Sequence, residues 1–473
     1  MFLNRERELA YLDEHFSSDR AEFLVVTGRR RVGKTSLLAH WAVDKPGLSF
    51  QAHLDADETL RREFSALVWQ ASYPDEPMPP GYAFPTWGDL FERLGHLARK
   101  KRFVVIIDEY PFLEGGQAHQ GRVASILQKV WDQHLQHTHI MLILCGSYLS
   151  VMYRTVLDRN APLHGRRTGQ ILLQPFTIDQ IGDFLSGYTA EQLVETYAMV
   201  GGMPAYLAHL SADLSLWENM ARTVLNRDHV LYMEPDLILR EELREPRLYA
   251  AILRAIAEGR HQLKDIAAAA GFTASSAAVR YLDTLQGLGL VERRIPVPPA
   301  SRPRPRGAWH IADPYLRFWA RWTLPHATTL TFGQPERLLY EVIRPGWEAF
   351  VGAVWEDLAR YHLARLSAQG HFPHLLTDVG AWWSPHQQID LVGVNRRHRF
   401  AVLGEAGWRR SPMGLKDLAA LKERERAWLD GRTDWLVHHV LYSRRGFTAE
   451  LAEQARQRAE GLLLFTSEDV VLG

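Results

Sequence analysis

The stretch GRRRVGKTS, residues 28–36, combines the residue types that bind a triphosphate. It fits the pattern GxxxxGK[ST], in which glycines let a loop turn its N–H groups towards phosphate oxygens. The N-terminus of the following helix adds positive potential, a lysine reaches the β and γ phosphates, and a threonine holds Mg²⁺. The residues that we assign to ATP here are Gly28, Arg31, Val32, Gly33, Lys34, Thr35 and Ser36.

Two further apolar runs end in polar residues. FVVIIDEY, residues 103–110, places Asp108 and Glu109 together, and two adjacent acids repel unless a cation lies beside them. We therefore predict that Asp108 binds Mg²⁺ and that Glu109 orients or deprotonates the attacking water. IMLILCGS, residues 140–147, ends in Ser147, which either senses the γ phosphate or only forms a turn.

These runs predict the sheet that positions the chemistry. Together with FLVVTG, residues 23–28, they are uninterruptedly apolar, which is typical of parallel strands buried on both faces. Amphipathic stretches between them predict an α/β fold. In such sheets ligands bind outside the carboxyl ends of the strands, where the polar residues fall.

A second set of acids lies in the last third. IDLVGV (389–394) and FAVLGEAGW (400–408) predict a hairpin, and a turn centred between Arg397 and His398 places Asp390 opposite Glu405. Like charges at cross-strand positions are destabilising unless a divalent cation lies between them. Glu356 lies beside an apolar helical stripe that runs from Trp347 to Leu358, and we include it in this predicted metal site.

The middle of the chain predicts a helical lid followed by a helix-turn-helix with a wing. The helices span 248–257, 263–270 and 275–286, and the strands 290–294 and 308–311. The wing is basic and proline-rich, so it could follow a DNA backbone; alternatively it is an intramolecular clamp or a linker. The predicted DNA contacts are Arg280 on the recognition helix and, on the wing, Arg293, Arg294, Arg302, Arg304 and Arg306.

Length and composition limit the number of domains and the class of protein. A chain of 473 residues predicts two to four domains. Its 55 basic and 55 acidic residues cancel, so the net charge does not indicate a nucleic-acid partner. The single cysteine excludes a disulfide framework and a cysteine-based zinc site. We find neither an apolar signal core nor a run long enough for a membrane span, and expect a cytoplasmic protein.

Over nearly its whole length, the sequence resembles archaeal and bacterial ATPases of the STAND-like branch of the AAA+ superfamily. The segments that carry the resemblance are FLNRERELAYL, GRRRVGKTS, DEYPFL, LCGSYLSVM, PLHGRR with ILLQPFT, and GGMPAYL. The resemblance implies that Arg5 helps to seat adenine, that Ser147 is a sensor and that Pro204 packs against the base. It also places an arginine finger at Arg166 or Arg167, acting in trans and hence implying self-association. An ordinary solvated arginine pair is the alternative.

The last third resembles PD-(D/E)XK nucleases, specifically a domain of unknown function fused to such ATPases, through Glu356, Asp390, Glu405 and the segment DPYLRFWARW. The family strand ends Glu-Cys-Lys, whereas this one reads Glu405-Ala406-Gly407. Arg409 cannot replace the lysine as a base because it stays protonated. Lys416, on the following predicted helix, could place its ammonium at the site instead. The resemblance therefore implies a nuclease-like site that is impaired.

These observations predict an α/β protein with four parts: a P-loop parallel-sheet ATPase core (1–177), a helical lid (178–240), a winged helix (241–312) and a C-terminal α/β nuclease-like domain (313–473). The predicted function is a DNA-associated switch in which ATP binds between core and lid and hydrolysis moves the lid. An active metal-dependent nuclease and a signalling ATPase that does not touch DNA are the alternatives.

Overall fold

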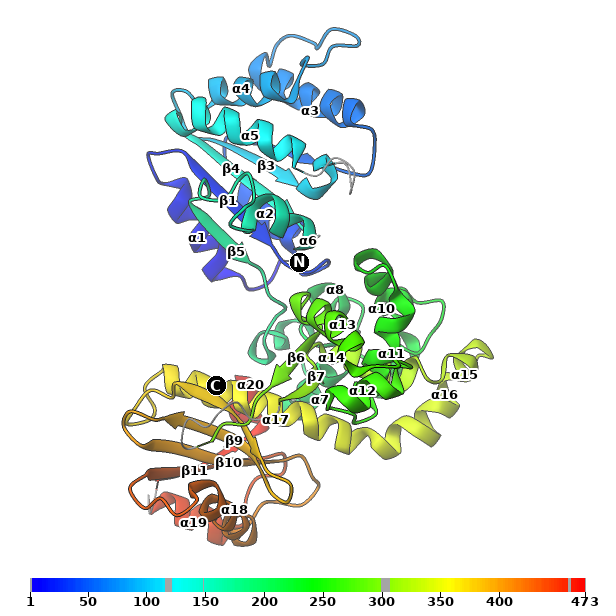
Figure 1. Ribbon diagram of the computed structural model, residues 1–473, viewed down its shortest axis with the longest axis vertical. Coiled ribbons are helices and arrows are strands. Elements are labelled where there is room, and N and C mark those ends of the chain that lie inside the picture. The colour runs from blue at the N-terminus through cyan, green and yellow to red at the C-terminus, as the bar shows by residue number, and fades with distance from the viewer. Residues whose placement is uncertain (1, 115–120, 148, 299–306, 458–460, 473) are drawn as a thin grey trace. The chain divides into compact units, whose positions relative to one another are not determined.

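The structure is a computed structural model that describes residues 2–114, 121–147, 149–298, 307–457 and 461–472. It divides into two units, Met1–Pro175 and Phe176–Gly473 (Figure 1). All three later parts of the predicted organisation fall within the second unit, and the division into four parts stays a prediction.

A five-stranded parallel sheet in the order β2-β3-β4-β1-β5 forms the centre of the first unit. The three apolar runs form its buried strands β1, β3 and β4, which confirms the predicted fold class. The sequence did not indicate β2, because this edge strand is mostly exposed. The elements are α1 Glu6–Phe16, β1 Glu22–Thr27, α2 Lys34–Ala42, β2 Gly47–Gln51, α3 Asp57–Ser72, α4 Trp87–Leu97, β3 Phe103–Asp108, α5 Arg122–Gln133, β4 Ile140–Gly146, α6 Leu149–Met152 and β5 Gly169–Leu172.

The register of this sheet brings the polar strand ends together. Thr27 at the end of β1 lies beside Gly146 at the end of β4, and Ile107 of β3 lies beside Leu144. The residues that follow these strands therefore meet at one edge of the sheet. This is the carboxyl edge at which an α/β sheet binds its ligand.

The second unit begins with helices and a winged helix. Helices α11 to α13 and the antiparallel pair β6–β7 closely match the predicted ranges, which confirms the winged helix. The elements are α7 Ala190–Val200, α8 Pro204–Leu207, α9 Leu216–Arg222, α10 Val230–Glu242, α11 Pro246–Ala257, α12 Leu263–Ala269, α13 Ser275–Gly287, β6 Val291–Arg294, β7 Ala308–Ile311, α14 Pro314–Phe318, α15 Ala327–Thr331 and α16 Pro335–Leu338.

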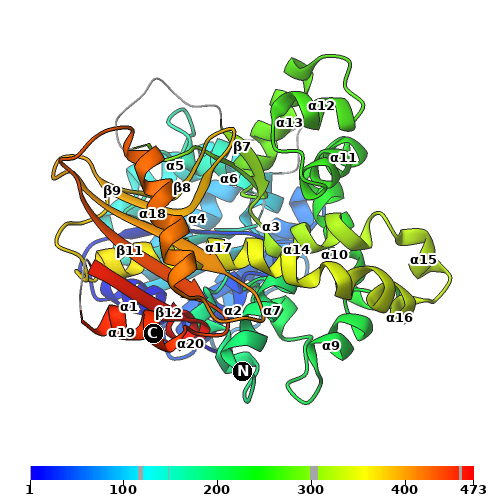
Figure 2. The same ribbon diagram turned by 90° about the horizontal axis from the view of Figure 1, so that it is seen from below.

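The unit ends in a mixed five-stranded sheet of order β12-β11-β10-β9-β8. Helix α17 packs on one face of this sheet and α18 on the other (Figures 1 and 2). The remaining elements are α17 Arg344–Ala368, β8 Asp378–Trp383, β9 Gln388–Asn395, β10 Phe400–Gly407, α18 Leu415–Leu429, β11 Leu436–Ser443, α19 Ala449–Arg456, β12 Leu462–Thr466 and α20 Ser467–Leu472.

The hairpin β9–β10 has the predicted register. Phe400 pairs with Asn395, and pairing continues through Gly404 and Leu391. The next positions along the two strands are Glu405 and Asp390, so the turn was placed correctly. Because side chains alternate along a strand, these two carboxylates start from the same face of the sheet.

The chain that leaves the wing strand β6 enters the C-terminal domain. Val297 belongs to the hydrophobic core of that domain, and its N–H donates to the carbonyl of Ala381 in β8 at 2.9 Å. The indole of Trp428 in α18 donates to the Val297 carbonyl at 2.9 Å. The segment therefore covers the outer edge of β8 and joins the winged helix to the C-terminal sheet.

Ion pairs connect the region that we predicted to form a lid with the C-terminal domain. Arg444 lies 2.9 Å from Glu191 of α7, and Arg365 of α17 lies 3.6 Å from Asp179. Helix α7 also packs against α17 and α20, so a movement of α7 would involve the C-terminal domain as well.

Candidate nucleotide-binding site and carboxylate cluster

The loop between β1 and α2 has the backbone conformation that the glycine pattern predicts. Gly28 leads out of β1, and a Cβ at this position would lie only 2.5 Å from the carbonyl oxygen of Leu173. Gly33 is left-handed, with φ of 96°, and is the N-cap of α2. Arg31 also has positive φ, whereas Thr35 and Ser36 are exposed in the first turn of the helix. The loop therefore ends at a helix N-terminus, where phosphate oxygens are favoured.

Lys34 lies inside this loop. Its buried ammonium donates to the carbonyls of Gly28 and Arg29, each at 3.1 Å. Burial lowers the pKa of Lys34, and the nearby carboxylates of Glu109 and Asp108 oppose that effect. A phosphate oxygen could replace these carbonyls as the partner of the charged ammonium.

Thr35 and Asp108 lie together as predicted. The Thr35 hydroxyl donates to Oδ2 of Asp108 at 2.6 Å, and the carboxylate is almost fully buried at the end of β3. A hydroxyl and a carboxylate side by side are two oxygen donors of the kind that Mg²⁺ prefers, so these residues fit the ion. Cys145 of β4 lies beside this carboxylate, and burial raises the pKa of its thiol.

Glu109 is held by Ser147. The serine hydroxyl lies 2.9 and 2.8 Å from the two carboxylate oxygens, and the serine N–H donates to Oε2 at 3.3 Å. Glu109 itself has a left-handed backbone, with φ of 48°, a conformation that costs a non-glycine residue about 1–2 kcal/mol. Such strain is common at functional sites, and here it accompanies a carboxylate turned towards the end of β4.

Arg5 makes contacts different from those we predicted for an adenine-binding residue. Its guanidinium donates to the carbonyl of Val32 in the P-loop at 3.3 Å and to that of Gln174 at 2.8 Å. It thereby ties the start of α1 to the loop and to the segment after β5. Contact with adenine stays a prediction, as does the packing of Pro204, the first residue of α8, against the base.

Arg166 is engaged within its own unit. Its Nε and Nη2 form a two-pronged pair with the carboxylate of Asp132 in α5, at 3.1 and 2.8 Å. A role in trans would require this pair to break, so the contacts do not support the predicted finger at Arg166. In the ranges that the structure covers, no carboxylate lies within ion-pair distance of Arg167, the alternative position.

The predicted DNA-binding arginines fall into three groups. Arg280 and Arg293 are exposed, and Arg280 pairs with Glu245 at 3.6 Å; the contact of either residue with DNA stays a prediction. Arg302, Arg304 and Arg306 lie outside the described residues. Arg294 is engaged within the chain, because its guanidinium pairs with Asp357 of α17 at 2.7 Å and with Glu292 at 2.5 Å, and its contact with DNA stays a prediction.

Asp357 is the centre of an ion-pair hub. It accepts from Arg294 of the wing, from Arg317 of α14 at 2.9 Å and from Arg360 on its own helix. Burial alone would raise the pKa of Asp357, but these guanidiniums outweigh burial and hold the pKa far below its usual range. These ion pairs connect β6 to α17, which agrees with the intramolecular clamp among the alternatives that the sequence left open.

The three carboxylates of the predicted nuclease-like site each have protein partners. Glu405 pairs with Arg424 at 2.7 Å, Glu356 with Arg360 at 3.6 Å, and Asp390 accepts from the backbone N–H of Ala406 at 3.2 Å. Among the residues described, no group of three or more acidic, histidine or cysteine side chains is arranged to hold a metal ion. The donor set therefore does not fit an ion as it stands, and the predicted metal site stays a prediction.

Asp390 is nevertheless the common electrostatic neighbour of the other two acids. Burial, with the charge of Asp390, raises the pKa of Glu356 to about 8. The same two causes raise the pKa of Glu405 to about 7. Neighbouring carboxylates favour the protonated form of one another, and their burial adds to this effect.

The cation at Glu405 comes from a residue that the sequence did not indicate. Arg424 reaches it from α18, whereas Lys416 is exposed and Arg409 pairs with Asp417 at 2.6 Å. At Gly407, where the nuclease family has lysine, a Cβ would lie 3.2 Å from the sulfur of Met413. A lysine there would require the Met413 side chain to shift by a few tenths of an ångström.

A parallel sheet whose carboxyl edge carries a P-loop, a threonine–aspartate pair and an adjacent glutamate defines a P-loop ATPase domain. Comparisons with known families agree: residues 2–210 match an ATPase domain described as predominantly from Archaea. Residues 250–294 match an IclR helix-turn-helix domain, and residues 319–426 match archaeal and bacterial proteins of unknown function.

A relative extends this likeness over nearly the whole chain. Uncharacterized protein MJECL04 of Methanocaldococcus jannaschii is 30% identical over 410 residues, which are 86% of this chain and 88% of that protein. The chain belongs to the same family as this archaeal protein. Among solved structures, the Walker-type ATPase PABY2304 of Pyrococcus abyssi has a TM-score of 0.53 at 22% identity, over 68% of this chain and 96% of that one. This second likeness concerns the fold alone.

The described helices contain no segment that is both long and apolar enough to cross a membrane.

Proposed function

We propose that this protein hydrolyses ATP with the help of Mg²⁺ and that the nucleotide state controls an association with DNA. The observation that carries the catalytic part is the Thr35–Asp108 contact of 2.6 Å beside the buried ammonium of Lys34. Two oxygen donors and a cation gathered at a helix N-terminus are the groups that phosphoryl transfer requires.

Each residue then has one task. Lys34 would bind the β and γ phosphates, and Thr35 and Asp108 would hold Mg²⁺, which supplies neutralisation of phosphate charge when bound. Glu109 would orient a water molecule and accept its proton as the water oxygen bonds to the γ phosphorus and ADP leaves. Ser147 touches Glu109 and acts through it, so we treat it as a positioning residue.

Binding and turnover of ATP test this assignment. In the Lys34→Ala variant we expect no heat on titration of ATP with Mg²⁺, because the phosphates lose their cation. Lys101→Ala removes an exposed lysine that precedes β3, at the amino end of the strand, and is the matched control. Retained ATP affinity in Lys34→Ala would contradict the proposed site.

The DNA part rests on the winged helix and on its exposed Arg280 and Arg293. ATP turnover with and without DNA separates the proposal from a switch that acts only on proteins, since such a switch would be indifferent to DNA. We expect the Arg280→Ala variant to lose part of any stimulation by duplex DNA. Turnover that DNA leaves unchanged would favour the protein-only alternative.

We further propose that the C-terminal domain is not an active nuclease. The supporting observation is that Arg424 pairs with Glu405 while no lysine follows on that strand. Incubation of plasmid with Mn²⁺ or Mg²⁺ should give the same result for the wild type and for Asp390→Ala. Cleavage that disappears in Asp390→Ala would establish the active nuclease instead.

A further inference from the structure

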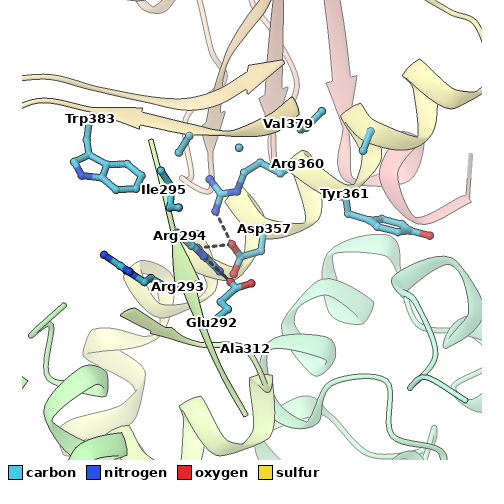
Figure 3. Close-up of a pocket in the computed structure, with 13 residues that line it drawn as sticks. Glu292, Arg293, Arg294, Ile295, Ala312, Asp357, Arg360, Tyr361, Val379 and Trp383 are labelled. Carbon is cyan, nitrogen blue, oxygen red and sulfur yellow. Dashed lines mark hydrogen bonds and ion pairs between the residues drawn. The ribbon is translucent and has the colours of Figure 1, made fainter. Parts of the chain in front are cut away.

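A cavity of about 480 Å³ lies between the wing strand β6, helix α17 and strand β8 of the second unit (Figure 3). We call it the β6–β8 cavity. Its volume is that of a site for a small molecule or a single unit of a polymer, and it is too small to enclose a double helix. None of the functions proposed above uses it.

Among the charged side chains that line this cavity, one cation has no carboxylate partner in the described part of the chain. Arg294 and Arg360 are engaged by Asp357, and Glu292 makes a second pair with Arg294. Arg293 also lines the cavity and is exposed, and in the described ranges no carboxylate pairs with it. The cavity therefore offers a single uncompensated guanidinium, a suitable partner for one phosphate group.

The same side of the cavity carries an aromatic surface. Trp383, at the end of β8, is only partly buried, and no aromatic ring of the described chain stacks on it. Ile295, which is 50% exposed, adds a second apolar side chain. Figure 3 shows Trp383, Ile295 and Arg293 on one side of the cavity, with Arg360 and Asp357 at its centre.

We infer that the β6–β8 cavity binds one nucleotide unit of single-stranded DNA, with the base on the Trp383 indole and the phosphate on Arg293. A partly exposed indole beside an uncompensated cation is the combination that single strands use, because an unpaired base offers its π face to an aromatic side chain. In a duplex these faces are already stacked. The inference deepens the proposed association with DNA and rests on it.

The surroundings indicate where such a strand would run. Arg360 lines the cavity and also donates to the carbonyl of Asp390 at 2.7 Å. It pairs with Glu356 at 3.6 Å as well, so it links the cavity to the carboxylate cluster. A strand bound there lies next to this cluster, which gives the domain a binding role that needs no cleavage.

Fluorescence anisotropy with a labelled oligothymidylate tests the inference on the full chain. We expect Trp383→Ala to weaken binding by roughly 5- to 150-fold, the loss for one base–aromatic stack. Trp383→Phe retains a stacking ring and should recover most of the affinity. Melting temperatures of both variants show whether they are folded.

The salt dependence tests the phosphate contact separately. Loss of one phosphate contact to a single strand reduces the slope of log affinity against log salt by about 0.7, and we expect this change in Arg293→Ala. Arg397→Ala is the control: it removes an exposed arginine at the β9–β10 turn that does not line the cavity, and it should leave the slope unchanged.

The remaining outcomes separate this inference from the proposed function. Wild-type affinity in folded Trp383→Ala overturns the inference, as does equal competition by free thymidine monophosphate. Binding of duplex but not of single strands overturns it too, while leaving an association with DNA intact. Binding of neither form overturns both.

Discussion

Replacing Asp357 with asparagine tests whether ion pairs hold the wing on the C-terminal domain. The carboxylate serves Arg294, Arg317 and Arg360, and the four side chains are 25, 23, 14 and 13% exposed, respectively. Breaking a fully buried pair costs about 3–5 kcal/mol and breaking an exposed one about 0–1 kcal/mol. Because these groups are mostly buried and the amide keeps some hydrogen bonds, we expect a loss of about 2–4 kcal/mol.

Hydrogen–deuterium exchange of the β6 amides measures this loss of stability at the strand that the ion pairs hold. A change of about 2–4 kcal/mol corresponds to exchange that is about 30- to 900-fold faster if β6 opens locally. The pair Arg337–Glu341 is 64 and 60% exposed, and its variant Glu341→Gln is the matched control, with an expected change below about 0.5 kcal/mol.

The pH dependence gives an independent check. The pKa of Asp357 is depressed in the folded chain, so its stabilising contribution is complete above the ordinary aspartate pKa and is lost only as the pH falls towards the folded value. The difference between wild type and Asp357→Asn should therefore be constant around neutral pH. Protection of β6 that is the same in both proteins would refute the clamp.

The other predictions concern the ATPase site and the carboxylate cluster. Glu109→Gln should bind ATP normally but turn it over about 10²- to 10⁴-fold more slowly, and unchanged turnover would place the base elsewhere. Ser147→Ala should lower kcat more than it changes KM, with recovery in Ser147→Thr, and an unaffected kcat would leave the contact purely structural. Arg166→Ala should lower the stability of the first unit by about 1 kcal/mol through loss of the Asp132 pair, whereas a large loss of turnover at unchanged stability would establish the finger. Glu356 has a raised pKa of about 8, so its ionisation opposes folding as the pH rises; Glu356→Gln should melt higher than wild type at about pH 9 and show little difference at about pH 5. Equal melting curves at both pH values would contradict this assignment.

The parts of the site whose positions agree with the sequence-based expectations are local in the chain. The P-loop pattern spans eight residues, and Asp108 follows a continuous apolar run, so each could be placed from its own neighbours. The parallel sheet then brings Thr35 and Asp108 together without further information. The hairpin register followed from the centre of its turn for the same reason.

The features that sequence reasoning missed depend on long-range packing. Arg424 lies 19 positions beyond Glu405, and only the packing of α18 on the sheet brings them together. Arg294 sits in a run of basic residues that reads as a solvated wing, yet its partner Asp357 lies more than 60 residues later. Whether a charged side chain is exposed depends on the folded surface, so the charge pattern of the sequence alone does not predict it.

The position of Val297 has a consequence for dissecting the protein. A fragment that starts after the winged helix would lack this side chain, the acceptor for Trp428 and the partner of the Ala381 carbonyl. Strand β8 would then have unpaired backbone groups at the edge of the sheet, and the core of the fragment would contain a cavity at the position of Val297. Both features favour aggregation. Expression plasmids for the last third should therefore begin upstream of β6, so that the fragment keeps Val297 and its contacts.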